Sequence, residues 1–77
     1  MIDLDQPVFQ TIETHPELLD ILVDLGFKPL ANPKMLNSVG KITSLRSGCK
    51  LIRLDIKKLI QTLHNNGYQV KGVEDHD

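Results

Sequence analysis

The chain of 77 residues has no tryptophan, one tyrosine, two phenylalanines and one cysteine. One cysteine excludes a disulfide within the chain, and no Cys-x-x-Cys or His-x-x-x-His pair exists. The histidines His15, His64 and His76 have no metal-ligand spacing with one another or with Cys49. No apolar run reaches the length of a membrane span. These absences predict a protein without metal, cofactor or membrane-spanning helix.

The sequence also lacks the residue patterns of catalysis. Its five glycines are dispersed, so no glycine-rich phosphate loop exists. Glu17, Asp20 and Asp24 recur at i, i+3 and i+7, which indicates a solvated helix face rather than an acid and base in one pocket. Cys49 falls on an apolar helical stripe, where cysteine behaves as a small hydrophobe. We therefore predict that the protein is not an enzyme.

Basic residues are missing from positions 1–27, which carry six acids. The beginning of the chain, with Asp3 and Asp5, does not resemble a basic and apolar secretion signal. A lone cysteine also suits a reducing compartment. Together these features predict a soluble bacterial protein in the cytoplasm.

Charge is divided sharply along the chain. Residues 1–27, 28–58 and 59–77 carry net charges of −6, +7 and −2. Such an asymmetry bears on association rather than on fold. In a symmetric homodimer, the acidic face at Glu17, Asp20 and Asp24 would meet basic residues twice. We expect self-association of this kind, together with a protein partner that the sequence does not identify.

Apolar residues at helical spacing predict an all-α fold, a compact array of about five short helices. The helices are expected to begin after Asp5, at Pro16, at Asn32-Pro33, after Thr43 or Ser44, and after Asp55. The third helix should run to about Ser38 and end at Gly40, and the fifth should end at Gly67.

The two ends of the chain depart from the helical pattern. Met1–Leu4 and Tyr68–Lys71 alternate well enough to pair as a minor two-stranded ribbon. Residues 74–77 are polar and acidic. We therefore expect one helical domain over residues 1–73 and a disordered acidic tail at 74–77.

The segment from Leu25 to Met35 predicts a shaped loop between two helices. Gly26 follows an apolar run as a helix-ending glycine would, and Asn32-Pro33 has the pattern of a helix cap followed by a first-turn proline. The candidate interaction loop consists of Phe27, Lys28, Pro29, Leu30, Asn32 and Pro33. Two interpretations stay open: Phe27 and Leu30 anchor a partner, or they plug the core beneath the loop.

A basic face is the second candidate surface. Arg46, Lys50 and Arg53 recur at i, i+4 and i+7 of the expected fourth helix, and Lys57 follows in the next one. A small nucleic-acid-binding module is therefore the alternative function. No aromatic residue interleaves these bases and the pI is 6.3, which favours a solvated face that meets the acidic helices. Gly48 within this helix indicates close approach of another helix, from the same chain or a second copy.

Several motifs resemble a small bacterial all-helical domain family of unknown function. They are His15-Pro16-Glu17-Leu18-Leu19, Leu25-Gly26-Phe27, Leu30-Ala31-Asn32-Pro33, Gly40–Leu45 and Asn66-Gly67-Tyr68, and the resemblance covers Ile2 to Val70. Members occur alone or ahead of hemerythrin-like and PAS sensor modules. The resemblance therefore implies a non-catalytic interaction or accessory module, linked to sensing or redox-associated systems.

A cousin branch of this family resembles the N-terminal domain of iron–sulfur repair proteins. That branch has a cysteine pair just after the Gly-Phe position, where this chain has Lys28 and Pro29. Because the thiolates are missing, we do not carry the cousin's metal or redox association over to this chain.

Overall fold

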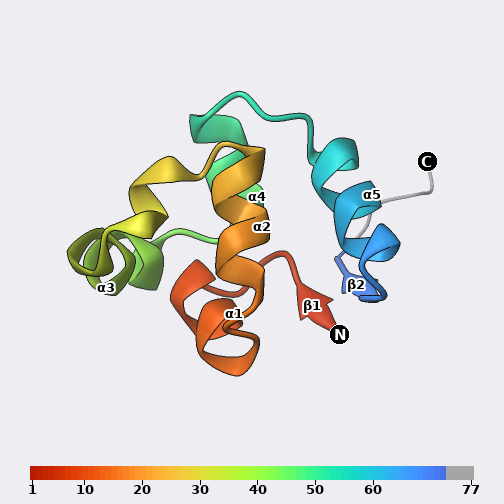
Figure 1. Ribbon diagram of the computed structural model, residues 1–77. Coiled ribbons are helices and arrows are strands. Elements are labelled where there is room, and N and C mark those ends of the chain that lie inside the picture. The colour runs from red at the N-terminus through yellow and green to blue at the C-terminus, as the bar shows by residue number, and fades with distance from the viewer. Residues whose placement is uncertain (73–77) are drawn as a thin grey trace.

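The computed structural model describes residues 1–72 of the chain. This part contains five α-helices, one 3₁₀ helix and two short strands, arranged as Figure 1 shows. In chain order they are β1 (Ile2–Asp3), α1 (Val8–Thr14), α2 (Leu18–Leu25), η1 (Lys28–Ala31), α3 (Pro33–Ile42), α4 (Leu45–Leu51), α5 (Ile56–Asn65) and β2 (Val70–Lys71). The predicted all-α array of about five short helices is confirmed. The predicted tail at 74–77 and His76 lie outside the described residues.

The two strands join the ends of the described chain. β1 pairs with β2 in parallel, with Ile2 opposite Val70 and Asp3 opposite Lys71. The predicted minor ribbon is therefore confirmed. Ile2 and Leu4 are fully buried, and the Leu4 carbonyl accepts a hydrogen bond from the Arg46 amide at 3.0 Å. The ribbon thus attaches both ends of the fold to the start of α4.

The core is built mainly from leucines, and its side chains come from β1, α1, α2, α4, α5 and the segment after β1. The large side chains with almost no exposure are Ile2, Leu4, Val8, Leu18, Leu22, Leu45, Cys49, Leu59 and Leu63. Burial raises the pKa of the Cys49 thiol to about 11, and the charge of Asp55 acts in the same direction. Cys49 is therefore a packed apolar residue, in agreement with the interpretation of its sequence position.

Local signals placed several helix ends correctly. Gly26 ends α2 with a φ of 129°, a backbone conformation that favours glycine. The side chains of Asn32, Ser44 and Asp55 each accept a backbone N–H in the first turn of α3, α4 and α5, at 2.9, 3.1 and 2.9 Å. These residues satisfy amide donors that the helix itself leaves unpaired.

The expected end of the third helix at Gly40 is wrong, because α3 continues through Gly40 to Ile42. Gly40 is buried where α1 packs against α3. A Cβ there would lie 3.1 Å from Leu36 Cδ1 of the same helix and at an ordinary contact distance of 3.5 Å from the Phe9 backbone nitrogen. The position is therefore part of the packed interior of the helix and does not end it.

The expected continuation of the fourth helix over Arg53 is also wrong. α4 ends at Leu51, and the Leu54 N–H donates to the Cys49 carbonyl at 2.9 Å, which closes the helix end. Arg53 has a φ of 59°. Glycine usually occupies this left-handed position, so its absence hid the helix end from sequence reasoning.

We expect Arg53→Gly to raise the free energy of unfolding by about 1 kcal/mol, because an L side chain in the left-handed region costs about 1–2 kcal/mol. Urea unfolding followed by circular dichroism measures the change. Lys50→Gly, within α4, is the matched control and should destabilise by about 1 kcal/mol. Equal effects of the two substitutions would show that the left-handed backbone conformation at Arg53 does not cost stability.

Candidate functional site

The predicted interaction loop contributes both a core plug and a pocket wall. Phe27 and Leu30 are 5% and 7% exposed, so both side chains are buried beneath the loop. The Phe27 ring lies directly over Gly48 of α4, where an added Cβ would stand 2.6 Å from Phe27 Cε1. The close approach expected at Gly48 is therefore an aromatic ring of the same chain and not another helix.

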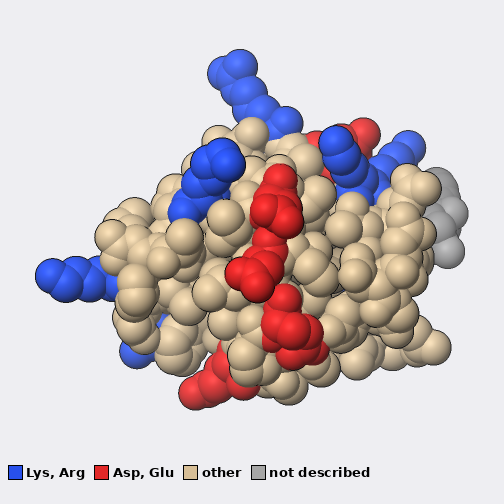
Figure 2. All heavy atoms as spheres, viewed as in Figure 1, with Lys and Arg blue, Asp and Glu red and all other residues tan. Residues whose placement is uncertain are grey.

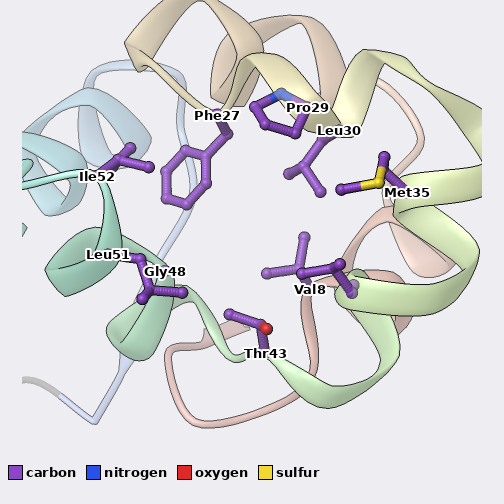
Figure 3. A pocket seen from close by; sticks show the side chains of 11 residues that line it. Val8, Phe27, Pro29, Leu30, Met35, Thr43, Gly48, Leu51 and Ile52 are labelled. Carbon is purple, nitrogen blue, oxygen red and sulfur yellow. The ribbon is translucent and has the colours of Figure 1, made fainter.

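An apolar pocket opens beside these two side chains, with a cavity volume of about 190 Å³. Figure 3 shows the side chains arranged around it, with Phe27, Pro29 and Leu30 on one side and Val8 and Thr43 opposite. The lining residues come from α1, α3, α4, and the segment around η1: Val8, Phe27, Pro29, Leu30, Met35, Val39, Gly40, Thr43, Gly48, Leu51 and Ile52. None of them carries a charge, so the pocket suits an apolar group.

The mouth of the pocket holds apolar side chains that face solvent. Met35 and Val39, one turn apart on α3, are 37% and 36% exposed, and Leu51 on α4 is 72% exposed. We call these three residues the pocket rim. Ile42 follows on α3 and is 85% exposed, but it does not line the pocket. Val39 and Ile42 were not predicted to lie on an exposed helix face, because the predicted third helix ended near Ser38 and α3 continues to Ile42.

Nine of the eleven lining residues come from a part of the chain that carries only basic charges, and Val8 and Phe27 come from the acidic part. Residues 28–54 contain six Lys and Arg and no acid. Five of these bases are exposed and adjoin a lining residue in the chain: Lys28, Lys34, Lys41, Lys50 and Arg53. Of these, Lys41 places its ammonium 4.9 Å from the centre of the Phe9 ring, toward α1.

Acidic side chains gather elsewhere. Figure 2 shows most of the acidic atoms of this face in one ridge over α2 and the neighbouring part of α1, while a smaller acidic patch lies among the Lys and Arg at the upper right. The exposed acids of these elements and the turn between them are Glu13, Glu17, Asp20 and Asp24. We call these four residues the acidic ridge. The division of charge in the sequence thus persists in the folded molecule.

The loop residues predicted as one surface have different roles. Phe27, Pro29 and Leu30 line the pocket, whereas Asn32 and Pro33 begin α3. Lys28 is exposed next to Pro29. The polar part of the predicted loop therefore divides between a helix cap and one base beside the pocket.

The predicted basic face is not one continuous helical stripe. Arg46 donates from Nε to Asp5 Oδ1 at 2.8 Å and from Nη2 to the Gly72 carbonyl, so it connects the two ends of the fold. Lys50 is exposed on α4, Arg53 lies beyond the helix end, and Lys57 lies in the first turn of α5. Arg46 has a structural role that the i, i+4 spacing did not reveal.

His15 contributes to a polar contact on the surface and not to a metal centre. Its Nδ1 lies 3.6 Å from Glu17 Oε2, and its ring meets Tyr68 edge to face. Across residues 1–72, no group of three or more His, Cys, Asp or Glu side chains could hold a metal ion. In the same part of the chain, no helix is long and apolar enough to cross a bilayer.

The Tyr68 hydroxyl donates to Glu17 Oε2 and holds the pKa of that carboxyl below its ordinary value of 4.5. Because the fold favours the ionised Glu17 carboxylate, the hydrogen bond to this carboxylate stabilises the protein above pH 4.5. This stabilisation disappears as the pH falls through the lowered pKa of Glu17. We expect Tyr68→Phe to raise the Glu17 pKa in a carboxyl-carbon NMR titration. The pKa of Asp5, lowered by Arg46, should not move. An unchanged Glu17 pKa would contradict this assignment.

The comparisons with known proteins agree with this fold. The model of the family described as "Domain of unknown function (DUF1858)" matches residues 2–60. The chain belongs to this family. Every residue that lines the pocket lies within the DUF1858 match. The resemblance found in the sequence is confirmed to this extent.

A solved relative has the same architecture as this DUF1858 domain. It is described as the crystal structure of the conserved domain protein from Streptococcus pneumoniae TIGR4, and it is 51% identical with a TM-score of 0.91. The similarity covers 95% of this chain and 92% of the relative. Among curated proteins, no match was found.

Proposed function

We propose that this DUF1858 domain is a non-catalytic protein-interaction module that binds an apolar side chain of a partner protein in the pocket. The observation that carries the proposal is the exposed apolar rim, Met35, Val39 and Leu51, around a pocket lined by uncharged residues. Small domains bury such side chains where they can, so an exposed rim around a cavity is typical of a docking site.

The size of the pocket suits one side chain. A protein cavity of roughly 150 Å³ lined by apolar residues is large enough to bind benzene. The pocket, at about 190 Å³, therefore has room for one aromatic or large aliphatic side chain. Pro29 and Pro33 restrict the backbone of the segment that forms one wall, so little conformational entropy is lost on binding.

The chemistry of the lining supports a non-catalytic role. Thr43 supplies the one side-chain hydroxyl among the lining residues, and no histidine, carboxylate or thiol is among them. Cys49 is buried on the core side of α4, and its pKa is raised. A module of this kind also fits the sensing and redox-associated contexts that the family resemblance implies.

The proposal is tested by selecting peptides from a random phage-displayed library on the immobilised protein. Selected clones are expected to contain a large apolar residue and to bind the double variant Val39→Gln/Leu51→Gln at least tenfold more weakly. Ile42→Gln is the matched control, because Ile42 is more exposed but does not line the pocket. All of these surface changes should leave stability nearly unchanged. Clones that bind the double variant as tightly as the wild type would overturn the proposal.

We also propose that the chain forms a homodimer through opposite charges, with the acidic ridge of one copy against the bases of the other. Light scattering at micromolar concentration should give twice the mass of the chain at low salt and a lower mass at high salt, because salt screens exposed charges. Asp20→Asn/Asp24→Asn should lower the dimer fraction, whereas Gln61→Ala, on α5, should not. A monomer mass in low salt would contradict self-association.

A further inference from the structure

We infer that the partner segment is acidic and amphipathic: one large apolar side chain enters the pocket, and flanking carboxylates face the surrounding bases. This inference rests on the proposed function and identifies the chemistry of its partner. It is carried by the combination of an uncharged pocket with a part of the chain, residues 28–54, that supplies nine of its eleven lining residues and carries only basic charges.

Charge complementarity favours this partner over a basic or neutral one. Lys28, Lys34, Lys50 and Arg53 are exposed and each adjoins a lining residue, while residues 28–54 contain no acid. A carboxylate next to the docked side chain therefore gains attraction from several bases. A lysine at the same place is repelled, which excludes basic partners.

The backbone at Arg53 is a second, independent observation. Arg53 has a φ of 59°, where glycine is more stable, and it follows Ile52, which lines the pocket. Residues held in sparsely populated backbone conformations cluster at active sites and ligand-binding sites. Recognition of a carboxylate at this side of the pocket explains why a guanidinium stands there.

A second copy of the chain fits the pocket less well. The acidic ridge could supply carboxylates, but across residues 8–25, which carry the ridge, no large apolar side chain is exposed to act as the anchor. Met1 is exposed, but its neighbour Ile2 is fully buried in the paired strand β1. The rim of another copy supplies apolar side chains, but it brings the same bases, and like charges would oppose one another. These features favour a segment of a different protein as the occupant.

The experiment uses a phage library in which one leucine is fixed at the centre of each peptide and the flanking positions vary freely. Clones whose binding depends on Val39 and Leu51 are expected to be enriched in Asp and Glu relative to the starting library. Peptides made from these clones should bind Lys28→Gln/Lys34→Gln/Lys50→Gln about tenfold more weakly, since three favourable charge pairs are lost. Raising the salt concentration should weaken the wild-type complex in the same way.

The matched control is Lys57→Gln/Lys58→Gln/Lys71→Gln, which removes the same charge from exposed residues that do not adjoin the pocket. It should weaken binding less than twofold.

Equal weakening by both triple variants, or rim-dependent clones without an excess of acids, would overturn this inference and leave the proposed pocket function standing. If no clone depends on the rim, the proposed function itself fails, and with it this inference. If the soluble Val39→Gln/Leu51→Gln variant, whose own pocket does not take up the peptides, displaces them from the immobilised wild type, the occupant is a second copy and the inference is wrong.

Discussion

Phe27→Ala is expected to lower the free energy of unfolding by about 3–5 kcal/mol, the usual cost of removing a buried aromatic ring. The Phe27 side chain is 5% exposed and packs over Gly48, so its removal joins the space it occupied to the adjoining pocket. A domain of 77 residues has a total stability of only about 4–12 kcal/mol. The variant should therefore lose a large fraction of its stability, and its unfolding transition should move to clearly lower urea concentration.

Urea unfolding followed by circular dichroism tests this expectation, and Phe9→Ala is its control. Phe9 is half-buried on α1, so the same change of residue type should cost clearly less there. A loss below 1 kcal/mol for Phe27→Ala would show that the ring is not a core plug. Because truncation at Phe27 removes stability, the test of partner binding uses Val39 and Leu51 at the rim instead.

Gly48→Ala is expected to destabilise the protein by about 1–3 kcal/mol, although alanine is the better helix former by about 1 kcal/mol. The added methyl group would lie 2.6 Å from Phe27 Cε1 and 3.5 Å from Phe27 Cζ. Aromatic rings do not shorten or bend, so the ring or the backbone of α4 must move. The contact with Phe27 therefore outweighs the gain in helix propensity.

A double-mutant cycle with Phe27→Leu separates these two effects. Leucine lacks the ring edge that meets position 48, so Gly48→Ala should be neutral or stabilising in the Phe27→Leu background. Lys50→Ala, on the exposed side of α4, is the control and should be nearly neutral in both backgrounds. If Gly48→Ala destabilises both backgrounds equally, Phe27 is not the reason for this glycine.

Sequence reasoning succeeded where a residue acts on its own backbone. Asn32, Ser44 and Asp55 accept amide protons within their own helices, and Gly26 adopts a conformation that its neighbours in the chain require. These effects depend on atoms a few residues apart. They were predictable because no other part of the fold has to be known.

The same reasoning failed where a distant segment decides the outcome. Gly40 does not end α3, and it is buried where α1 packs against that helix. Arg46 matches a solvated basic stripe in spacing but pairs with Asp5 and with the Gly72 carbonyl. In both cases the partner lies far away in the sequence, so no local pattern contains it.

The sequence by itself determined the all-α class, most helix starts, the ribbon of the two ends and the division of charge, since periodicity, capping and composition are local properties. Only the tertiary structure decided that Phe27 and Leu30 are buried and that Met35, Val39 and Leu51 surround a pocket. Whether an apolar side chain is a core residue or a docking surface depends on which other elements cover it. Which elements cover a side chain is decided only in the assembled fold. The periodicity of apolar residues along the sequence is the same for a core residue and for a docking surface.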